Sequence, residues 1–215
     1  QADATLPPLQ VALAAPTGKA SARMRESIRK GLDQYVESLG DSLGDVTTPI
    51  AVREFLESLQ TSTLHRLLGF SPQTPSRFRH NKDTPLAYQV VIVDETSMVD
   101  FAMMTKLIDA VSPSARLILI GDPNQLASVE ARTVLSDLSG PAQVGSPRLS
   151  PPCIDYLEST CKLPVRGDVE PIDGVPLYDS IVQLNKTHRF SDSSGIGHFA
   201  RACLDGSESF DPARA

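Results

Sequence analysis

Four consecutive apolar residues, Val90 to Val93, run directly into two acidic residues, Asp94 and Glu95. An unbroken apolar run of this length, rich in β-branched residues, is typical of a strand buried on both faces of a parallel sheet. Because such a strand carries no charge within it, the two acids are expected at its C-terminal end, where open α/β sheets bind ligands. One acid there can hold Mg²⁺ and the other can orient or deprotonate a water. The same run is also compatible with two solvated acids.

A second polar loop is expected at the end of a neighbouring strand. The stretch Arg116 to Ile120, which is apolar after its arginine, predicts a buried strand. That strand ends in Gly121-Asp122-Pro123-Asn124-Gln125-Leu126. A glutamine at that edge can hydrogen-bond a terminal phosphate or the water that attacks it. Between the two strands, Asp100 is expected to cap a helix over residues 101–111. That helix is predicted to bury Met104, Leu107, Ile108 and Val111.

The N-terminal region predicts a strand at Leu9 to Ala14, a glycine-containing turn and a basic helix that extends to about Gly31. Thr17 is the expected N-cap. This order resembles a phosphate loop, but Leu13 stands where the first glycine would be and Ala20 replaces the hydroxyl residue that holds Mg²⁺. A helix N-terminus with a basic face still suits a phosphate, including one of a nucleic-acid backbone. The alternative is an ordinary solvated basic helix.

The middle of the chain predicts a helix over residues 52–60 and a capped short helix over 61–69 that ends at glycine. His65 lies in the short helix, and a lone histidine is more often structural than functional. Residues 71–85 are rich in proline and serine and are expected to form an exposed loop.

The C-terminal third has few periodic patterns. Residues 139–178 hold seven of the 17 prolines and predict a long surface connection. A strand is expected at 180–184 and a closing helix at 194–204. Arg189 follows that strand, where it could reach a phosphate from the opposite side or form a surface ion pair.

Composition limits the class of protein. The 215 residues are 40% hydrophobic, and no apolar run approaches the roughly 20 residues of a membrane span. The three cysteines lack CxxC spacing and indicate reduced cytosolic thiols rather than a metal site. A net charge of −6 means that any nucleic-acid contact must come from local basic patches. The loop-like ends of the sequence suggest a piece of a longer protein.

Five stretches together resemble superfamily 1 DNA helicases of the RecD type. Residues 15–20 are similar to motif Ia, 63–69 to the next DNA-contacting motif, 91–98 to motif II, 119–126 to motif III, and 186–197 to motif IV. Their order and spacing extend over nearly the whole chain, which makes the resemblance specific. It implies a RecA-like P-loop NTPase motor domain of α/β class with a mainly parallel sheet at residues 1–138. A connecting segment at 139–179 and the start of a second motor domain at 180–215 follow.

The resemblance also implies roles for individual residues. Asp94 would hold Mg²⁺, Glu95 would activate the attacking water, and Gln125 would sense the γ-phosphate of ATP. Arg189 would contact that phosphate from the second motor domain. The single-stranded DNA path would be lined by Pro16, Thr17, Lys19, Thr63 and His65.

For the whole protein, the resemblance implies ATP-dependent 5′ to 3′ translocation on single-stranded DNA. It also implies double-strand break repair and recombination with the RecB and RecC subunits in the bacterial cytoplasm. The family's Walker A loop and its last two motifs are not found in residues 1–215, so these residues alone are expected to be inactive. Arg132 stands where the family usually has glycine. Two alternatives stay open: a stand-alone RecD-like or relaxase-linked helicase, and a non-catalytic module that binds nucleotide or DNA.

Overall fold

The computed structural model describes residues 9–39, 47–74, 77–122, 125, 134–139, 149–162, 164, 177, 179–182 and 184. The chain separates into two compact units, Gln1–Pro141 and Ala142–Ala215. In the described part of the chain, no helix is both long and apolar enough to span a membrane.

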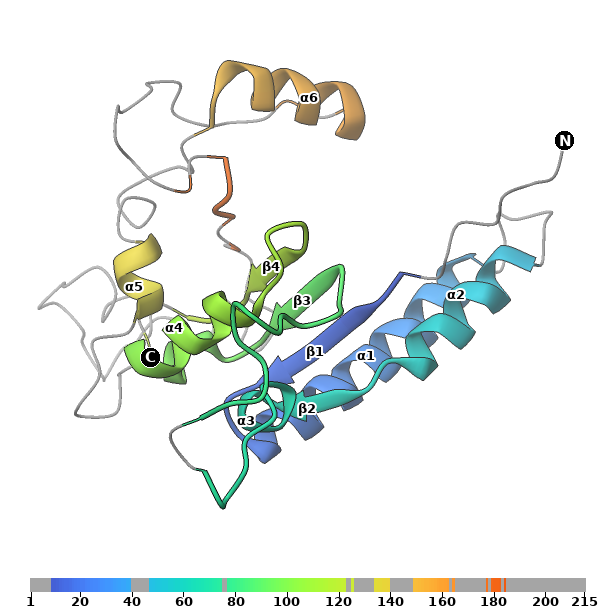
Figure 1. Cartoon of the computed structure of the whole chain (residues 1–215). Coiled ribbons are helices and arrows are strands. Elements are labelled where there is room, and N and C mark those ends of the chain that lie inside the picture. Colours follow the sequence, from blue (N-terminus) through green and yellow to red (C-terminus); the bar gives the residue numbers. More distant parts are fainter. Residues whose placement is uncertain are drawn as a thin grey trace, which may run out of the picture. The chain divides into compact units, whose positions relative to one another are not determined.

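The first unit is built on a four-stranded parallel sheet (Figure 1). Its strands are β1 (Val11–Ala15), β2 (Thr61–Thr63), β3 (Val90–Val93) and β4 (Arg116–Leu119), in the order β2-β1-β3-β4. The register pairs Ala14 with Val93, and Val93 with Leu119. The strands therefore end level with one another, and the loops that follow β1, β3 and β4 leave the same edge. This confirms the predicted α/β class with a parallel sheet.

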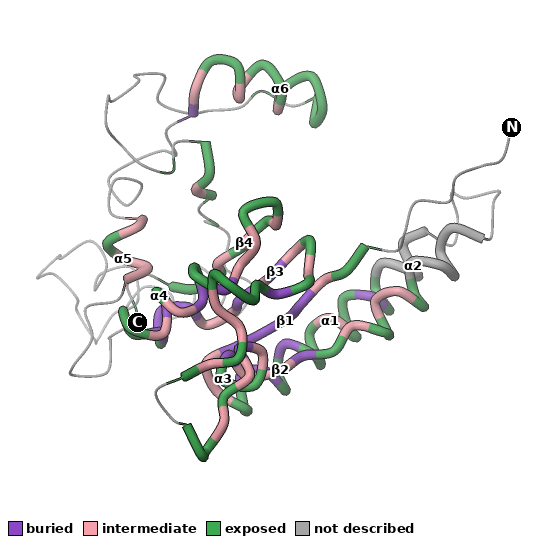
Figure 2. Tube along the Cα trace, in the orientation of Figure 1, coloured by how far each residue is buried: buried purple, intermediate pink, exposed green. Residues whose placement is uncertain are grey.

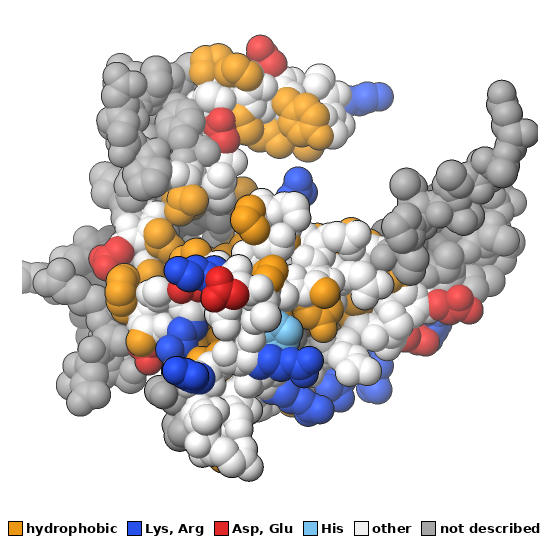
Figure 3. Space-filling model, viewed as in Figure 1, with side chains coloured by type: hydrophobic (Ala, Val, Ile, Leu, Met, Phe, Trp, Pro, Cys, Tyr) orange, Lys and Arg blue, Asp and Glu red, His pale blue; other side chains and the backbone are white. Residues whose placement is uncertain are grey.

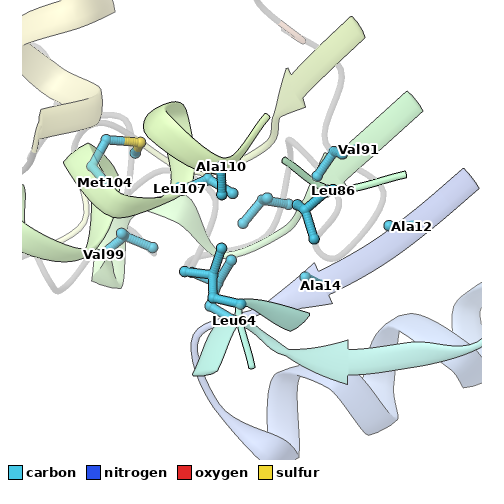
Figure 4. Close-up of a cluster of buried hydrophobic side chains, with 11 residues drawn as sticks. Ala12, Ala14, Leu64, Leu86, Val91, Val99, Met104, Leu107 and Ala110 are labelled. Carbon is cyan, nitrogen blue, oxygen red and sulfur yellow. The ribbon is translucent and has the colours of Figure 1, made fainter. Parts of the chain in front are cut away.

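One face of the sheet carries the hydrophobic core (Figure 4). Alternate residues of the two central strands point to this face, and all four are buried: Ala12, Ala14, Val91 and Val93. They are covered by Leu64 of α3 (Leu64–Leu67), by Leu86, and by α4 (Phe101–Ala110). Figure 2 shows the resulting concentration of burial in the central strands. This packing holds the loop after β3 on a rigid base.

The opposite face is covered in part by α1 (Gly18–Leu39), which packs against β1 and β2. Ala20, Met24 and Leu32 are buried along α1. The helix extends well past Gly31, where it was predicted to stop, because Gly31 lies on the exposed side and the apolar spacing continues to Leu32. The next helix, α2 (Thr47–Ser58), packs against α1 and begins earlier than predicted.

Several burial predictions were wrong. On β3, which was expected to be buried on both faces, Val90 and Ile92 are half-buried, and so is Val111 after α4. The fourth strand is not buried: its residues alternate between exposed and half-buried, and Ile118 is 38% exposed. β4 has a strand partner on one side only, among the strands that the structure describes. On α4, Ile108 is 54% exposed, because the buried stripe runs through Met104, Leu107 and Ala110 and leaves Ile108 to one side.

Several short elements were not predicted. Residues 61–63 form β2 before the short helix begins, and η1 (Thr96–Met98), a single 3₁₀ turn, follows β3. The helix α5 (Val134–Ser139) follows later in the chain. The predicted cap is confirmed at Asp100, whose carboxylate accepts a hydrogen bond from Met103 N at 2.7 Å.

The second unit contains α6 (Pro151–Cys161), inside the stretch expected to lack regular structure. Ser150 caps this helix by accepting a hydrogen bond from Cys153 N, and Pro151 suits the first turn. Asp179 accepts hydrogen bonds from the Ser150 hydroxyl and amide, at 2.6 Å each, and these bonds lower the pKa of Asp179. The strand predicted at 180–184 is absent at 180–182 and 184, the described residues of that range. The predicted helix at 194–204 lies outside the described residues.

Candidate functional site

Asp94 leaves the sheet in a fixed position. Its amide donates to Ala14 O at 2.9 Å, which continues the β1–β3 hydrogen bonding by one residue. Its carboxylate oxygen Oδ1 accepts from Glu95 N at 2.8 Å. Both acids are half-buried as whole residues. The sequence placed this pair at the C-terminal end of the strand, and the structure has it there.

Glu95 adopts a left-handed backbone conformation, with φ 53° and ψ 40°. A residue with a Cβ atom pays roughly 1–2 kcal/mol for this conformation, so the surrounding contacts must hold it. The hydrogen bonds that hold it are made by the next residue, Thr96, which is fully buried. Thr96 N donates to Ile120 O at 2.9 Å, and the Thr96 hydroxyl donates to Val93 O at 3.1 Å. The chain therefore turns sharply at Glu95, two residues after the end of β3.

The loops after β3 and β4 are packed against each other. Gly121, just after β4, lies so close to η1 that an added Cβ atom would sit 3.0 Å from Ser97 N and 3.1 Å from Thr96 N. The same atom would lie 2.7 Å from a Leu135 methyl carbon. Glycine therefore suits this close approach of two backbones, and a larger residue would force the neighbours to adjust. The contact fixes the β4 loop relative to the acid pair.

Gln125 is held by the loop of the acid pair. The Ser97 hydroxyl donates to Gln125 Oε1 at 3.1 Å, and Gln125 N donates to Asp122 O at 3.2 Å. Ser97 is 5% exposed, whereas Gln125 is exposed. Three residues predicted from separate motifs, Asp94, Glu95 and Gln125, thus belong to one pair of loops at the strand ends.

The donor set fits a magnesium ion that keeps most of its water. Among the described residues, no group of three or more His, Cys, Asp or Glu side chains could enclose a metal. Mg²⁺ is usually bound by one or two carboxylates together with waters and substrate phosphates, not by an all-protein cage. The arrangement of Asp94 and Glu95 is suited to that mode of binding.

A second group of candidate residues follows β1 and β2. The register pairs Ala15 with Thr63, so Pro16 and Thr17 leave the sheet beside the start of α3. Thr17 caps α1, because its hydroxyl accepts from Ala20 N at 3.2 Å and its carbonyl from Ser21 N at 3.0 Å. Lys19 is exposed in the first turn of that helix. The predicted cap is confirmed, and the lysine is accessible.

Thr63 and His65 occupy the neighbouring turn. Thr63 caps α3 by accepting from Arg66 N at 3.3 Å. The exposed His65 ring meets Phe70 edge to face at 5.4 Å and lies 5.9 Å from the Phe78 ring. His65 therefore has a packing role whatever else it contacts. Figure 3 shows Lys and Arg side chains gathered over the part of the molecule that holds α3 and the start of α1.

The structure thus brings the predicted residues together in two adjoining groups. The first group is the acid pair with Gln125, after β3 and β4. The second group lies at the ends of β1 and β2 and consists of Pro16, Thr17, Lys19, Thr63 and His65. Arg189 and Arg132 lie outside the described residues. Sequence reasoning missed Ser97 and Gly121 as site residues, although both lie inside recognised motifs, because nothing in the sequence shows which loops touch.

Known proteins are similar to this chain over most of the first unit. The family model described as an AAA domain matches residues 2–131. The RecBCD enzyme subunit RecD of Mycolicibacterium smegmatis is 48% identical over 132 residues, 61% of this chain. The subunit of the same name from Haemophilus influenzae is 40% identical over 192 residues, 88% of this chain. The ATP-dependent RecD2 DNA helicase of Deinococcus radiodurans is 42% identical over 123 residues, 57% of this chain.

The chain spans only a part of each of these relatives. The matches extend over 22% of the M. smegmatis protein, 27% of the H. influenzae protein and 13% of the D. radiodurans protein. The AAA domain match nevertheless covers more than half of the chain, including both groups of candidate residues in the first unit. The chain therefore belongs to the AAA domain family, and its relatives within bacteria include RecD subunits and a RecD2 helicase.

Proposed function

We propose that this chain is the central part of the motor of an ATP-dependent DNA helicase of the RecD type. The observation that carries the proposal is the acid pair at the end of β3, with Glu95 turned out of the strand and Gln125 held beside it by Ser97. In this role Asp94 holds Mg²⁺, Glu95 activates the attacking water and Gln125 contacts the γ-phosphate. Arg189 supplies positive charge from the second motor domain.

The second group of residues is proposed to bind single-stranded DNA. Pro16, Thr17 and Lys19 begin a helix whose N-terminal amides and lysine suit a phosphate of the backbone. Thr63 and His65 lie on the adjacent strand end, which would extend the path by a neighbouring contact. Because β1 pairs directly with β3, the part of the DNA group that follows β1 lies beside the nucleotide group. Such closeness supports coupling of hydrolysis to movement on DNA.

Residues 1–215 contain no GxxxxGK[ST] phosphate loop, so the proposal requires one from another segment. The sheet has room for it: β4 is unpaired on one side among the described strands, and Ile118 and Ile120 are exposed there. A further parallel strand beside β4 would bring a phosphate loop to the same edge as Asp94 and Gln125. The division into a motor domain at 1–138, a connection at 139–179 and a second domain from 180 remains part of the proposal.

The full protein is proposed to be the RecD subunit of an exodeoxyribonuclease V complex, with RecB and RecC as partners, in the bacterial cytoplasm. A stand-alone RecD2-like helicase is the second candidate. The H. influenzae RecD match extends over 88% of the chain, against 57% for the D. radiodurans RecD2 match, which favours the first. Co-purification of the full-length protein with RecB and RecC distinguishes the two.

The proposed activity is tested by unwinding. The full-length protein should separate a duplex that carries a 5′ single-stranded tail, should require ATP and Mg²⁺, and should leave a duplex with only a 3′ tail intact. Unwinding from the 3′ tail would contradict the proposed direction. Binding of single-stranded DNA without hydrolysis or unwinding would identify a non-catalytic module instead.

A further inference from the structure

We propose that Ser97 is a positioning residue that holds the Gln125 side-chain amide in place for contact with the terminal phosphate. This inference deepens the proposed function and rests on it. It begins from the 3.1 Å hydrogen bond in which the Ser97 hydroxyl donates to Gln125 Oε1.

The Ser97 side chain starts from a rigid position. Ser97 is 5% exposed and lies in η1, where Met98 N donates to Glu95 O at 3.0 Å and Val99 N to Thr96 O at 3.0 Å. On its other side, Gly121 lies close to the Ser97 backbone, since a Cβ atom added to Gly121 would be 3.0 Å from Ser97 N. The hydroxyl is therefore presented from a fixed backbone at the base of the β4 loop.

Gln125 needs such a partner. Its side chain has three rotatable bonds and is exposed, so it would otherwise sample many orientations. Its amide also has two chemically different ends: Oε1 only accepts hydrogen bonds, and Nε2 only donates them. A phosphate oxygen is an acceptor. Only the orientation that turns Nε2 toward the phosphate is productive.

The serine hydroxyl holds one end of the amide and leaves the other end available to the phosphate. When Ser97 donates to Oε1, the oxygen is held against η1 and the Nε2 hydrogens remain free to donate elsewhere. In the opposite orientation Nε2 would donate to Ser97 Oγ and the amide would present an oxygen to the phosphate, which cannot donate to a phosphate oxygen. The phosphate therefore favours the orientation found here, once Ser97 holds the amide in place. Since Ser97 is two residues after Glu95, the same 3₁₀ turn that follows the acid also holds the amide.

The test is steady-state ATP hydrolysis by the full-length protein with saturating single-stranded DNA. Ser97→Ala should lower kcat roughly tenfold, as expected for loss of one ordered hydrogen bond, with KM for ATP and affinity for DNA unchanged. Ser97→Thr, which keeps a hydroxyl, should recover most of the rate. Ser21→Ala is the matched control, since Ser21 is buried to the same extent (6% exposed) on α1. It should behave as the unsubstituted protein.

A double-mutant cycle separates positioning from a merely structural effect. In a Gln125→Ala background, Ser97→Ala should have almost no further effect on kcat, because the amide that it holds is gone. An equal and independent loss in that background, or an unchanged kcat for Ser97→Ala, would overturn the inference. If Ser97→Ala lowers the Tm, Ser97→Cys, which preserves size and weakens the donor, takes its place in the cycle.

Failure of this inference is distinguishable from failure of the proposed function. A Glu95→Gln variant is assayed in parallel. If it loses hydrolysis while Ser97→Ala does not, only the role of Ser97 is wrong. If Glu95→Gln also retains full activity, the assignment of the whole site is wrong.

Discussion

At the scale of single residues, the site depends on two backbone features that side-chain chemistry alone would not reveal. Glu95 occupies the left-handed region, which non-glycine residues rarely adopt, and Gly121 permits an approach that an added Cβ atom would make tight. Strained backbone that is fixed by its surroundings is common at functional sites. Here the strained residue is Glu95, which is proposed to activate water. The residue after it, Thr96, is hydrogen-bonded to Val93 of β3 and to Ile120 just after β4.

Lys19 gives a residue-scale prediction for DNA binding. Lys19→Ala should weaken binding of single-stranded DNA uniformly across sequences and reduce the slope of log K against log salt by about 0.7, the value for one phosphate contact on a single strand. Fluorescence anisotropy at several salt concentrations measures both.

Lys30→Ala is the control for that experiment. Lys30 is an exposed lysine later on the same helix and forms a 2.8 Å ion pair with Glu26, so its removal should change binding little. Equal effects of the two substitutions would show that Lys19 acts only through general charge and not through a defined contact.

At the scale of elements, α4 holds the acid pair in place from behind the sheet. Its stripe of Met104, Leu107 and Ala110 packs on the strand face that contains Val91 and Val93. Sequence patterning identified the helix, its Asp100 cap and two of its buried residues. It could not distinguish Ile108 from Leu107, because a helix of ten residues with apolar positions on adjacent sides has more than one possible buried face.

The consecutive residues Leu107 and Ile108 of α4 give a direct test of that packing. Leu107→Ala removes a fully buried side chain and should lower the free energy of unfolding of the first unit by about 2–5 kcal/mol. Ile108→Ala, at a position that is 54% exposed, should cost less than half as much. Urea denaturation measures both, and similar costs would mean that α4 is rotated relative to the sheet.

At the scale of the whole molecule, the sequence was enough to predict the parallel α/β fold, the location of the acid pair and Gln125 at strand ends, and the turn of Pro16, Thr17 and Lys19 after β1. Continuous apolar runs followed by polar residues carry that information. The strand end at Thr63 was not predicted. What could not be predicted depends on tertiary contact. The exposure of β4 was missed because it depends on which strand is at the edge of the sheet. The helix α6 was missed because it lacks a clear apolar stripe. The Ser97–Gln125 hydrogen bond was missed because it joins residues 28 positions apart.

The same scale yields a prediction about residues 1–215 in isolation. With saturating single-stranded DNA they should not hydrolyse ATP, because phosphoryl transfer requires a backbone cradle, a lysine and a hydroxyl on Mg²⁺. The loop at Lys19 lacks two of these features, because Leu13 replaces the first glycine of the cradle and Ala20 replaces the hydroxyl residue. Hydrolysis that is stimulated by DNA and abolished by Glu95→Gln would instead identify Lys19 as the phosphate lysine.

The central claim is that the acid pair at the end of β3 drives ATP hydrolysis, and it is tested most directly by Glu95→Gln in the full-length protein. The variant should bind ATP normally, since Asp94 still holds Mg²⁺, and its DNA-stimulated kcat should fall by about a hundredfold or more. Glu54→Gln, an exposed position on α2, serves as the control and should leave the rate unchanged. Near-normal turnover by Glu95→Gln would contradict the assignment of Glu95 as the base that activates water.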